Sequence, residues 1–205
     1  MKYSAEETRV HHILLARARR VSVPLAEAMR NVGPVSSQRG DHPSLSHFLA
    51  RAIIGQQLSA SAARSIWERV TTAAKNAQMD VPAFAESDAD AVRVCGVSRN
   101  KIRALQSVRV AERTGTLCET QLEGLNPQDR VATLLRIHGV GPWTCDMALI
   151  FYYYLPDIWP EGDAAVQRTF ARLIGRRNPK LTAAHFSPHR SSLALVMWRV
   201  VDQPL

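Results

Sequence analysis

Apolar and polar positions follow the period of an α-helix along most of the chain. In each such segment apolar residues recur three and four positions apart, a spacing that places them on one face of a helix. No segment shows the strict alternation typical of a strand, so the sequence predicts an all-α protein. The expected helices cover residues 6–20, 45–54, 59–77, 88–94, 99–115, 126–139, 163–175 and 187–202, with a further helix beginning at residue 142.

Residues that start or stop helices stand at the ends of these segments. Ser59 and Ser98 directly precede helical patterns, where a serine side chain accepts a hydrogen bond from a first-turn amide. Asn126 followed by Pro127 is a start signal of the same kind. The segment 33–44 is rich in Gly, Pro and Ser and therefore predicts a loop.

Length and composition are those of an ordinary globular protein. The chain has 205 residues, of which 46% are hydrophobic and 21% charged, enough to bury a sizeable core. It contains no run of eighteen apolar residues, which excludes a membrane span. Glu6 and Glu7 lie in an N-terminal segment without an apolar stretch, which argues against a signal or transit peptide. Cys95, Cys118 and Cys145 are widely spaced and odd in number, so they indicate a reducing compartment rather than a disulfide framework.

The chain is strongly basic. The formal net charge is +8 and the isoelectric point is about 10.0. Such an excess attracts phosphate backbones without reading their sequence. A basic surface that serves only solubility would have the same charge, so charge alone does not decide between the two.

Residues 136–151, RIHGVGPWTCDMALIF, combine a glycine-rich turn with an apolar helix. Gly139 and Gly141 can adopt positive φ and let the backbone approach another molecule closely. The first amides of the helix that begins at Pro142 have no intrahelical partner. Together with the positive end of the helix dipole, they suit a phosphate. A plain turn between two helices, in which the glycines only permit the reversal, is the alternative.

The order of motifs resembles the helix-hairpin-helix DNA glycosylase superfamily, and within it the 3-methyladenine DNA glycosylase II branch. The hairpin segment LLRIHGVGPWTCDMAL is followed by PEGD directly before another helix. Upstream, RAIIGQQLSASAARSIWERV and VSRNKIRAL resemble family segments, and downstream FSPHRSSLALVMW resembles the C-terminal helix. The resemblance covers roughly residues 45–202 in order, which makes it more specific than any single motif.

The resemblance implies a single glycosylase domain over 1–205 with two helical lobes and a cleft between them. The expected central lobe covers about 45–150 and includes the hairpin at 134–150. The expected second lobe combines about 1–44 with 151–205. The chain has no room for the β-rich N-terminal lobe of the enterobacterial form, so it resembles a compact, helical version.

The implied function is hydrolysis of the N-glycosidic bond of alkylated purines in duplex DNA. Purines of the 3-methyladenine and 7-methylguanine type would leave an abasic site for base excision repair. The alternatives are a glycosylase of the same fold for a deaminated or oxidised base, and a non-catalytic module that only binds DNA. The expected partner is double-stranded DNA with alkylated bases, bound by a monomer without cofactor, catalytic metal or membrane. The resemblance leaves open whether the hairpin carbonyls hold a monovalent or divalent ion. The expected location is the cytoplasm, at the nucleoid, of a bacterium, or the nucleus of a eukaryote.

Asp163 matches the catalytic position of the family. Cleavage passes through a cationic sugar, which an ionised carboxylate stabilises while it orients or deprotonates the attacking water. From its local context Asp163 is equally an N-cap, and the two roles are compatible because a helix N-terminus favours the anionic form. Asp157 and Glu161 are rivals on the same loop. A purine methylated at N3 or N7 is already cationic and leaves as a neutral base, so a second carboxylate is not required.

Trp143 stands where relatives that also cut the DNA strand carry a lysine. The lysine amine attacks C1′ of the sugar and forms a Schiff base, which tryptophan cannot do. The resemblance therefore implies a monofunctional enzyme without lyase activity, in which water is the nucleophile.

Four side chains are candidates for the pocket that holds the damaged base. Electron-rich rings attract a cationic base by stacking and cation–π contact. Trp198 matches the family's other aromatic position, and Met147 stands where the enterobacterial enzyme has a tyrosine. Packing in the core is the alternative for each candidate. The candidates are Trp143, Met147, Trp159 and Trp198.

The segment GQQLS at residues 55–59 lies where the family places the wedge that fills the gap left by the rotated nucleotide. Gln57 matches the intercalating position, Leu58 lies beside it, and Gln56 can bond the unpaired base. Which of Gln57 and Leu58 inserts is open, and a polar turn with a buried Leu58 is the alternative. The hairpin candidates for phosphate binding are His138, Gly139, Val140, Gly141 and Thr144. Further candidates for phosphate contacts are Arg99, Lys101, Arg168 and Arg172.

Overall fold

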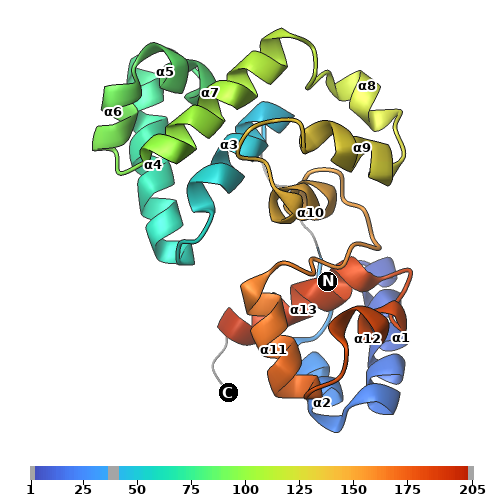
Figure 1. The fold of residues 1–205 in the computed structure, drawn as a ribbon. Coiled ribbons are helices and arrows are strands. Elements are labelled where there is room, and N and C mark those ends of the chain that lie inside the picture. The colour runs from blue at the N-terminus through green and yellow to red at the C-terminus, as the bar shows by residue number, and fades with distance from the viewer. Residues whose placement is uncertain (1–2, 37–41, 203–205) are drawn as a thin grey trace. The chain divides into compact units, whose positions relative to one another are not determined.

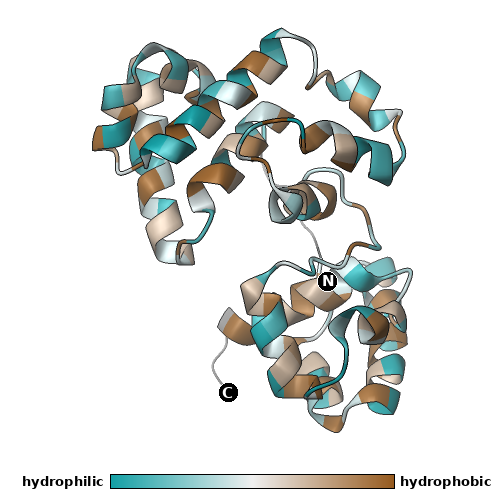
Figure 2. Ribbon diagram, in the orientation of Figure 1, coloured by the Kyte–Doolittle hydropathy of each residue, from teal (hydrophilic) through white to brown (hydrophobic). Residues whose placement is uncertain are grey.

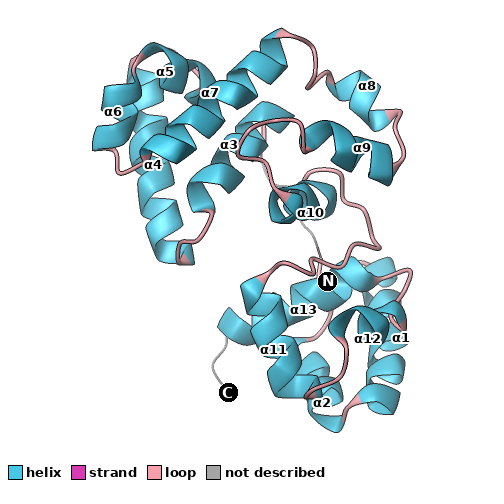
Figure 3. Ribbon diagram, viewed as in Figure 1, coloured by secondary structure: helices cyan, strands magenta, loops and turns pink. Residues whose placement is uncertain are grey.

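The computed structural model describes residues 3–36 and 42–202 (Figure 1). These residues form thirteen α-helices and no strand (Figure 3), which confirms the all-α prediction. No helix in the described part of the chain is both long enough and apolar enough to cross a membrane. The chain divides into two compact units, one of Met1–Gly40 with Leu149–Leu205 and the other of Asp41–Ala148.

The unit built from the two ends of the chain has α2, α11 and α13 packed against one another and α1 packed on α2. Hydrophobic and hydrophilic residues share each helix (Figure 2), and the hydrophobic ones form the core. Its helices are α1 (Ala5–Val21), α2 (Val23–Val32), α11 (Ala164–Ile174), α12 (Pro179–Ala184) and α13 (Arg190–Asp202). Its largest fully buried side chains are Leu14, Leu25, Met29, Phe170 and Phe186.

In the other unit α3 packs against α4 and α7, and α5 packs against α7. The helix that follows the hairpin, α10 (Pro142–Phe151), begins in this unit and ends in the first. The remaining helices are α3 (Leu45–Gly55), α4 (Ala60–Asn76), α5 (Val81–Ser87), α6 (Ala89–Val94), α7 (Arg99–Arg113), α8 (Glu119–Glu123) and α9 (Pro127–Leu134). Fully buried side chains of this unit include Leu45, Leu49, Ile53, Ile54, Leu105, Leu122 and Leu134.

Three of the predicted helix starts are confirmed by their caps. Ser59, Ser98 and Asn126 are the N-caps of α4, α7 and α9, and each side chain accepts a first-turn amide hydrogen bond. Each bond satisfies an amide that would otherwise lack an acceptor. Of the loop expected over 33–44, residues 33–36 and 42–44 are not helical, and residues 37–41 lie outside the described residues.

Four short helices, α2, α5, α8 and α12, were not expected from the sequence. Three of them carry proline in the first turn, where its missing N–H costs no helical hydrogen bond. Two boundaries differ from the predicted ones by three residues or more. Helix α9 ends at Leu134 rather than Gly139, because tight turns from Thr133 to Val140 replace its last turn. The C-terminal helix begins at Arg190 rather than at residue 187.

The hairpin between α9 and α10 depends on a close contact between Gly139 and α7. Gly139 has a φ of +85°, and a Cβ at this position would overlap the side chain of Ala104. Gly141 does not take a positive φ, contrary to expectation, and a Cβ on it would meet no atom within 4 Å. The turn therefore needs glycine at position 139 for its fold, whereas Gly141 leaves open space beside the start of α10.

Substitution of Gly139 by alanine should lower the free energy of unfolding by about 2–4 kcal/mol. The new Cβ adds an unfavourable left-handed backbone conformation to an overpacked contact with Ala104. The matched control is Gly141→Ala, which should change the free energy of unfolding by less than about 0.5 kcal/mol. Urea denaturation followed by circular dichroism measures both variants. Equal destabilisation by the two substitutions would contradict this account of the hairpin.

Candidate active site and nucleic-acid interface

Asp163 is the N-cap of α11 and lies within the unit that contains both ends of the chain. Its Oδ1 accepts a hydrogen bond of 2.8 Å from the backbone N–H of Val166. The same oxygen accepts one of 3.1 Å from the indole Nε1 of Trp198. Only 7% of Asp163 is exposed. The carboxylate is therefore held by the start of one helix and by a side chain of another, α13.

This arrangement suits a carboxylate that must stabilise positive charge. Burial strengthens the interaction of Asp163 with nearby charge, because water is excluded from around it. As the N-cap of α11, the carboxylate lies at the positive end of the helix dipole. The two hydrogen bonds fix its orientation before any substrate arrives, so no reorganisation is needed when charge develops.

The two rival carboxylates on the same loop have other partners. Asp157 receives hydrogen bonds from Arg190 Nε at 2.7 Å, from Arg190 Nη2 at 3.0 Å and from Ser187 Oγ at 2.8 Å. Burial raises the pKa of Asp157, but its bonds with Arg190 and Ser187 outweigh burial and bring the pKa below its ordinary value. Glu161 is exposed and lies 3.8 Å from the ammonium of Lys180. Asp157 thus ties the loop to the start of α13, and Glu161 faces solvent.

The aromatic candidates of this unit differ in their surroundings. Trp198 is half-buried, and its ring centroid lies 5.4 Å from that of Phe151 at an interplanar angle of 38°. Trp159 is 8% exposed, packs edge-on against Phe170 and belongs to the hydrophobic core. Its indole Nε1 is buried without a hydrogen-bond partner among the described residues. The structure brings Trp198 to Asp163 and gives Trp159 a packing role.

The candidates on α10 lie near its N-terminal end. Trp143 is half-buried in the first turn, and Met147, one turn later, is 7% exposed. Thr144 is 1% exposed and Val140 5% exposed. His138 is exposed on the turn itself.

The segment 55–59 ends α3 and presents two side chains to solvent. Gln57 has a φ of +59°, an uncommon conformation for a residue other than glycine, and its side chain is exposed. Leu58 is 39% exposed, so the alternative of a polar turn with a buried Leu58 is wrong. The turn offers one polar and one apolar side chain at adjacent positions.

Gln56 and Lys101 hold this turn in place. Gln56 Nε2 donates to the carbonyl oxygen of Gly139 and to Oγ1 of Thr144, both at 3.0 Å. Lys101 Nζ donates to the carbonyl oxygens of Ile54 and Gln56 at 2.9 and 2.8 Å. Burial lowers the pKa of the Lys101 ammonium. Lys101 therefore caps the end of α3, and Gln56 joins the turn to the hairpin.

Two residues that position the site were not expected. Phe151 contacts Trp198 and lies four residues after Met147 on the apolar run of α10, a spacing that was visible in the sequence. Arg190 pairs with Asp157 across 33 positions, and no local pattern indicates such a pair. Within residues 3–36 and 42–202, no three His, Cys, Asp or Glu side chains form a group that could hold a metal ion.

Known proteins with similar sequence and fold are DNA glycosylases. No family model matches the sequence. DNA-3-methyladenine glycosylase 1 of Schizosaccharomyces pombe is 29% identical over 161 residues, which cover 74% of this chain and 70% of the relative.

Two solved structures align with most of this chain, and each is 25% identical to it in sequence. The 3-methyladenine DNA glycosylase Mag1 of Schizosaccharomyces pombe, in complex with abasic DNA, has a TM-score of 0.80 over 96% of this chain and 98% of its own. The DNA-3-methyladenine glycosidase of Bacillus halodurans has a TM-score of 0.70 over 92% of this chain and 88% of its own. In sequence and in fold, this chain is similar to the 3-methyladenine DNA glycosylases of these organisms.

Proposed function

We propose that this protein releases alkylated purines from duplex DNA by hydrolysis, with Asp163 as its catalytic carboxylate. Glycosylase activity on alkylated bases, as a step of base excision repair, accords with the relatives, which are named for 3-methyladenine. The observation that carries the residue assignment is the position of Asp163. It is a buried carboxylate at a helix N-terminus, oriented by the Val166 amide and the Trp198 indole.

In the proposed reaction the bond between C1′ and the purine nitrogen breaks, and its electron pair leaves with the base. A purine alkylated at N3 or N7 carries a positive charge, so this electron pair makes it a neutral leaving group. Positive charge then resides on the sugar, where the anionic Asp163 stabilises it. The oxygen of water forms the new bond to C1′, and its proton passes to Asp163 or to solvent. The product is an abasic sugar in an uncut strand.

The indole of Trp198 contributes to the same step. Its N–H fixes the carboxylate, and its electron-rich ring attracts a cationic base. The roles of Trp143, Met147 and Trp159 at the base stay predictions. Because Trp159 is buried in the core, we expect its ring to support the loop that precedes α11 rather than to contact the base.

The DNA strand is bound by the hairpin and by the turn at residues 55–59. Open space at Gly141 supports close approach of a phosphate to the first amides of α10. The exposed Gln57 enters the base stack with Leu58 beside it. Gln56 braces the turn against the hairpin, because its amide already bonds Gly139 and Thr144.

Replacement of Asp163 by asparagine should reduce single-turnover release of 3-methyladenine and 7-methylguanine by at least about 100-fold, on the scale of a lost transition-state contact. Asparagine is as good an N-cap as aspartate, so folding and duplex affinity should persist. The matched control is Glu161→Gln, a carboxylate on the same loop that should keep full activity. Methylated duplex DNA is the substrate, with released bases separated by chromatography. Undiminished release by Asp163→Asn would contradict the assignment of Asp163 as the catalytic carboxylate.

The same assay tests the proposed substrate. Release of only oxidised or deaminated bases by the wild type would contradict it.

The proposed enzyme has no lyase activity, because Trp143 cannot form a Schiff base. Incubation with methylated duplex and sodium borohydride should yield no protein–DNA adduct, and strand breaks should appear only after hot alkali. A bifunctional glycosylase with a catalytic lysine is the positive control. A trapped adduct, or breaks without alkali, would overturn the monofunctional mechanism.

A further inference from the structure

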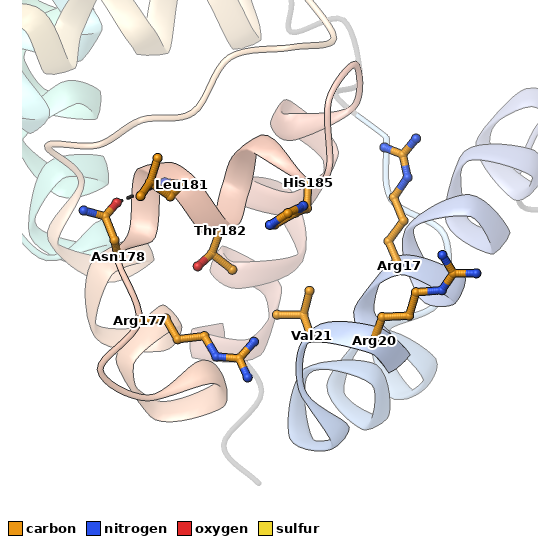
Figure 4. Close-up of a pocket in the computed structure, with 8 residues that line it drawn as sticks. All are labelled: Arg17, Arg20, Val21, Arg177, Asn178, Leu181, Thr182 and His185. Carbon is orange, nitrogen blue, oxygen red and sulfur yellow. Dashed lines mark hydrogen bonds between the residues drawn. The ribbon is translucent and has the colours of Figure 1, made fainter.

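A basic pocket lies in the unit formed by Met1–Gly40 and Leu149–Leu205, between α1 and α12 (Figure 4). Its volume is about 580 Å³. Three arginines line it, Arg17 and Arg20 from α1 and Arg177 from the loop that precedes α12. Arg177 extends towards Val21 on the opposite wall. Cationic groups thus reach the pocket from both of its walls.

Among the described residues, no carboxylate neutralises these cations. Within the part of the chain that the structure describes, no aspartate or glutamate lines the pocket, and none of the three arginines forms an ion pair. Other surface arginines of the protein, such as Arg9 and Arg109, do pair with a glutamate. An uncompensated cluster of like charges is unfavourable unless an anion joins it.

The other lining groups suit a phosphate ester. Asn178 and His185 add polar side chains that can bond an anion, and Val21 and Leu181 add apolar surface. Leu181 is 68% exposed, so its side chain is accessible to a ligand. Asn178 Oδ1 accepts the Leu181 amide at 3.0 Å, which fixes the residue at the pocket rim. The volume lies in the range of about 300–1,000 Å³ typical of ligand pockets.

We propose that this pocket binds a phosphate-bearing anion with more than one phosphate group. Planar guanidinium groups match phosphate oxygens in pairs, and three of them exceed what a single phosphate requires. The phosphates come either from a DNA strand outside the active site or from a free polyphosphate. Binding of a DNA strand rests on the proposed function, whereas binding of a free polyphosphate does not.

The test compares two double variants that remove the same charge. Arg20→Ala with Arg177→Ala changes the pocket, whereas Arg19→Ala with Arg176→Ala changes the preceding residues on the same helix and loop. All four side chains are exposed, and each variant removes two charges from the formal net charge of +8. Arg17 is left intact because its guanidinium also bonds the Ser187 carbonyl. The glutamine versions of both variants provide a second matched pair.

The first arm measures binding of sodium tripolyphosphate by calorimetry without DNA. If the source is a free polyphosphate, wild type and control bind it, and the pocket variant loses at least about tenfold in affinity. The second arm measures binding of an undamaged duplex at several salt concentrations. If the source is DNA, the slope of log affinity against log salt falls by up to about 1.8 in the pocket variant only, at about 0.9 per phosphate.

Identical behaviour of the pocket and control variants in both arms would overturn the proposal, because only overall charge would then matter. Release of methylated bases is measured in parallel on all proteins. A wild type that releases no base but binds tripolyphosphate through the pocket arginines would contradict the proposed function alone.

Discussion

The buried carboxylate of Asp163 is the constraint on which the surrounding structure depends. A charge removed from water is stable only if hydrogen-bond donors or opposite charge replace its hydration. The first turn of α11 supplies one donor and Trp198 of α13 supplies another. The donors come from separate helices, so the packing of α11 against α13 sets the direction of the carboxylate. The pair of Asp157 with Arg190 then fixes the start of α13 to the loop that leads to Asp163.

In the other unit, hydrogen bonds hold the exposed turn at residues 55–59 in place without covering its tip. The rigidity of this turn matters for the proposed function. Rotation of a nucleotide out of a duplex costs a few kcal/mol, and a flexible wedge would add the free-energy cost of its own ordering. Lys101 and Gln56 prevent this, since they tie the end of α3 to α7 and to the hairpin. Their polar groups are used inside the protein, which leaves Gln57 and Leu58 exposed at the tip. In the proposed function, backbone amides rather than long cations bind the phosphate at the hairpin.

Local patterns in the sequence predicted those structural features, such as helix caps, that depend only on neighbouring residues. The caps Ser59, Ser98, Asn126 and Asp163 were predicted because capping needs only the following three residues. Four short helices were missed, three of them because proline at their start reads as a loop signal. Contacts between distant residues could not be predicted. The bond from Trp198 to Asp163 spans 35 positions and that from Gln56 to Gly139 spans 83.

The resemblance to a family was visible in the order of motifs along the sequence. The role of a single residue, in contrast, depends on which atoms its side chain contacts in the folded protein. Lys101 illustrates the difference, because its sequence context indicated a phosphate contact. Its ammonium instead bonds two carbonyl oxygens at the end of α3. The catalytic role of Asp163 stays a prediction of the same kind, now supported by its geometry.

Affinity for a charged transition-state mimic tests the central claim most directly. Two duplexes of one sequence would carry, at one position, either a cationic pyrrolidine abasic analogue or an uncharged tetrahydrofuran analogue. Phosphate contacts are the same in both, so the ratio of their affinities isolates the charge at the sugar. The account predicts that the wild type prefers the cation by about 100-fold or more and that Asp163→Asn abolishes this preference. An unchanged preference in the variant would contradict it.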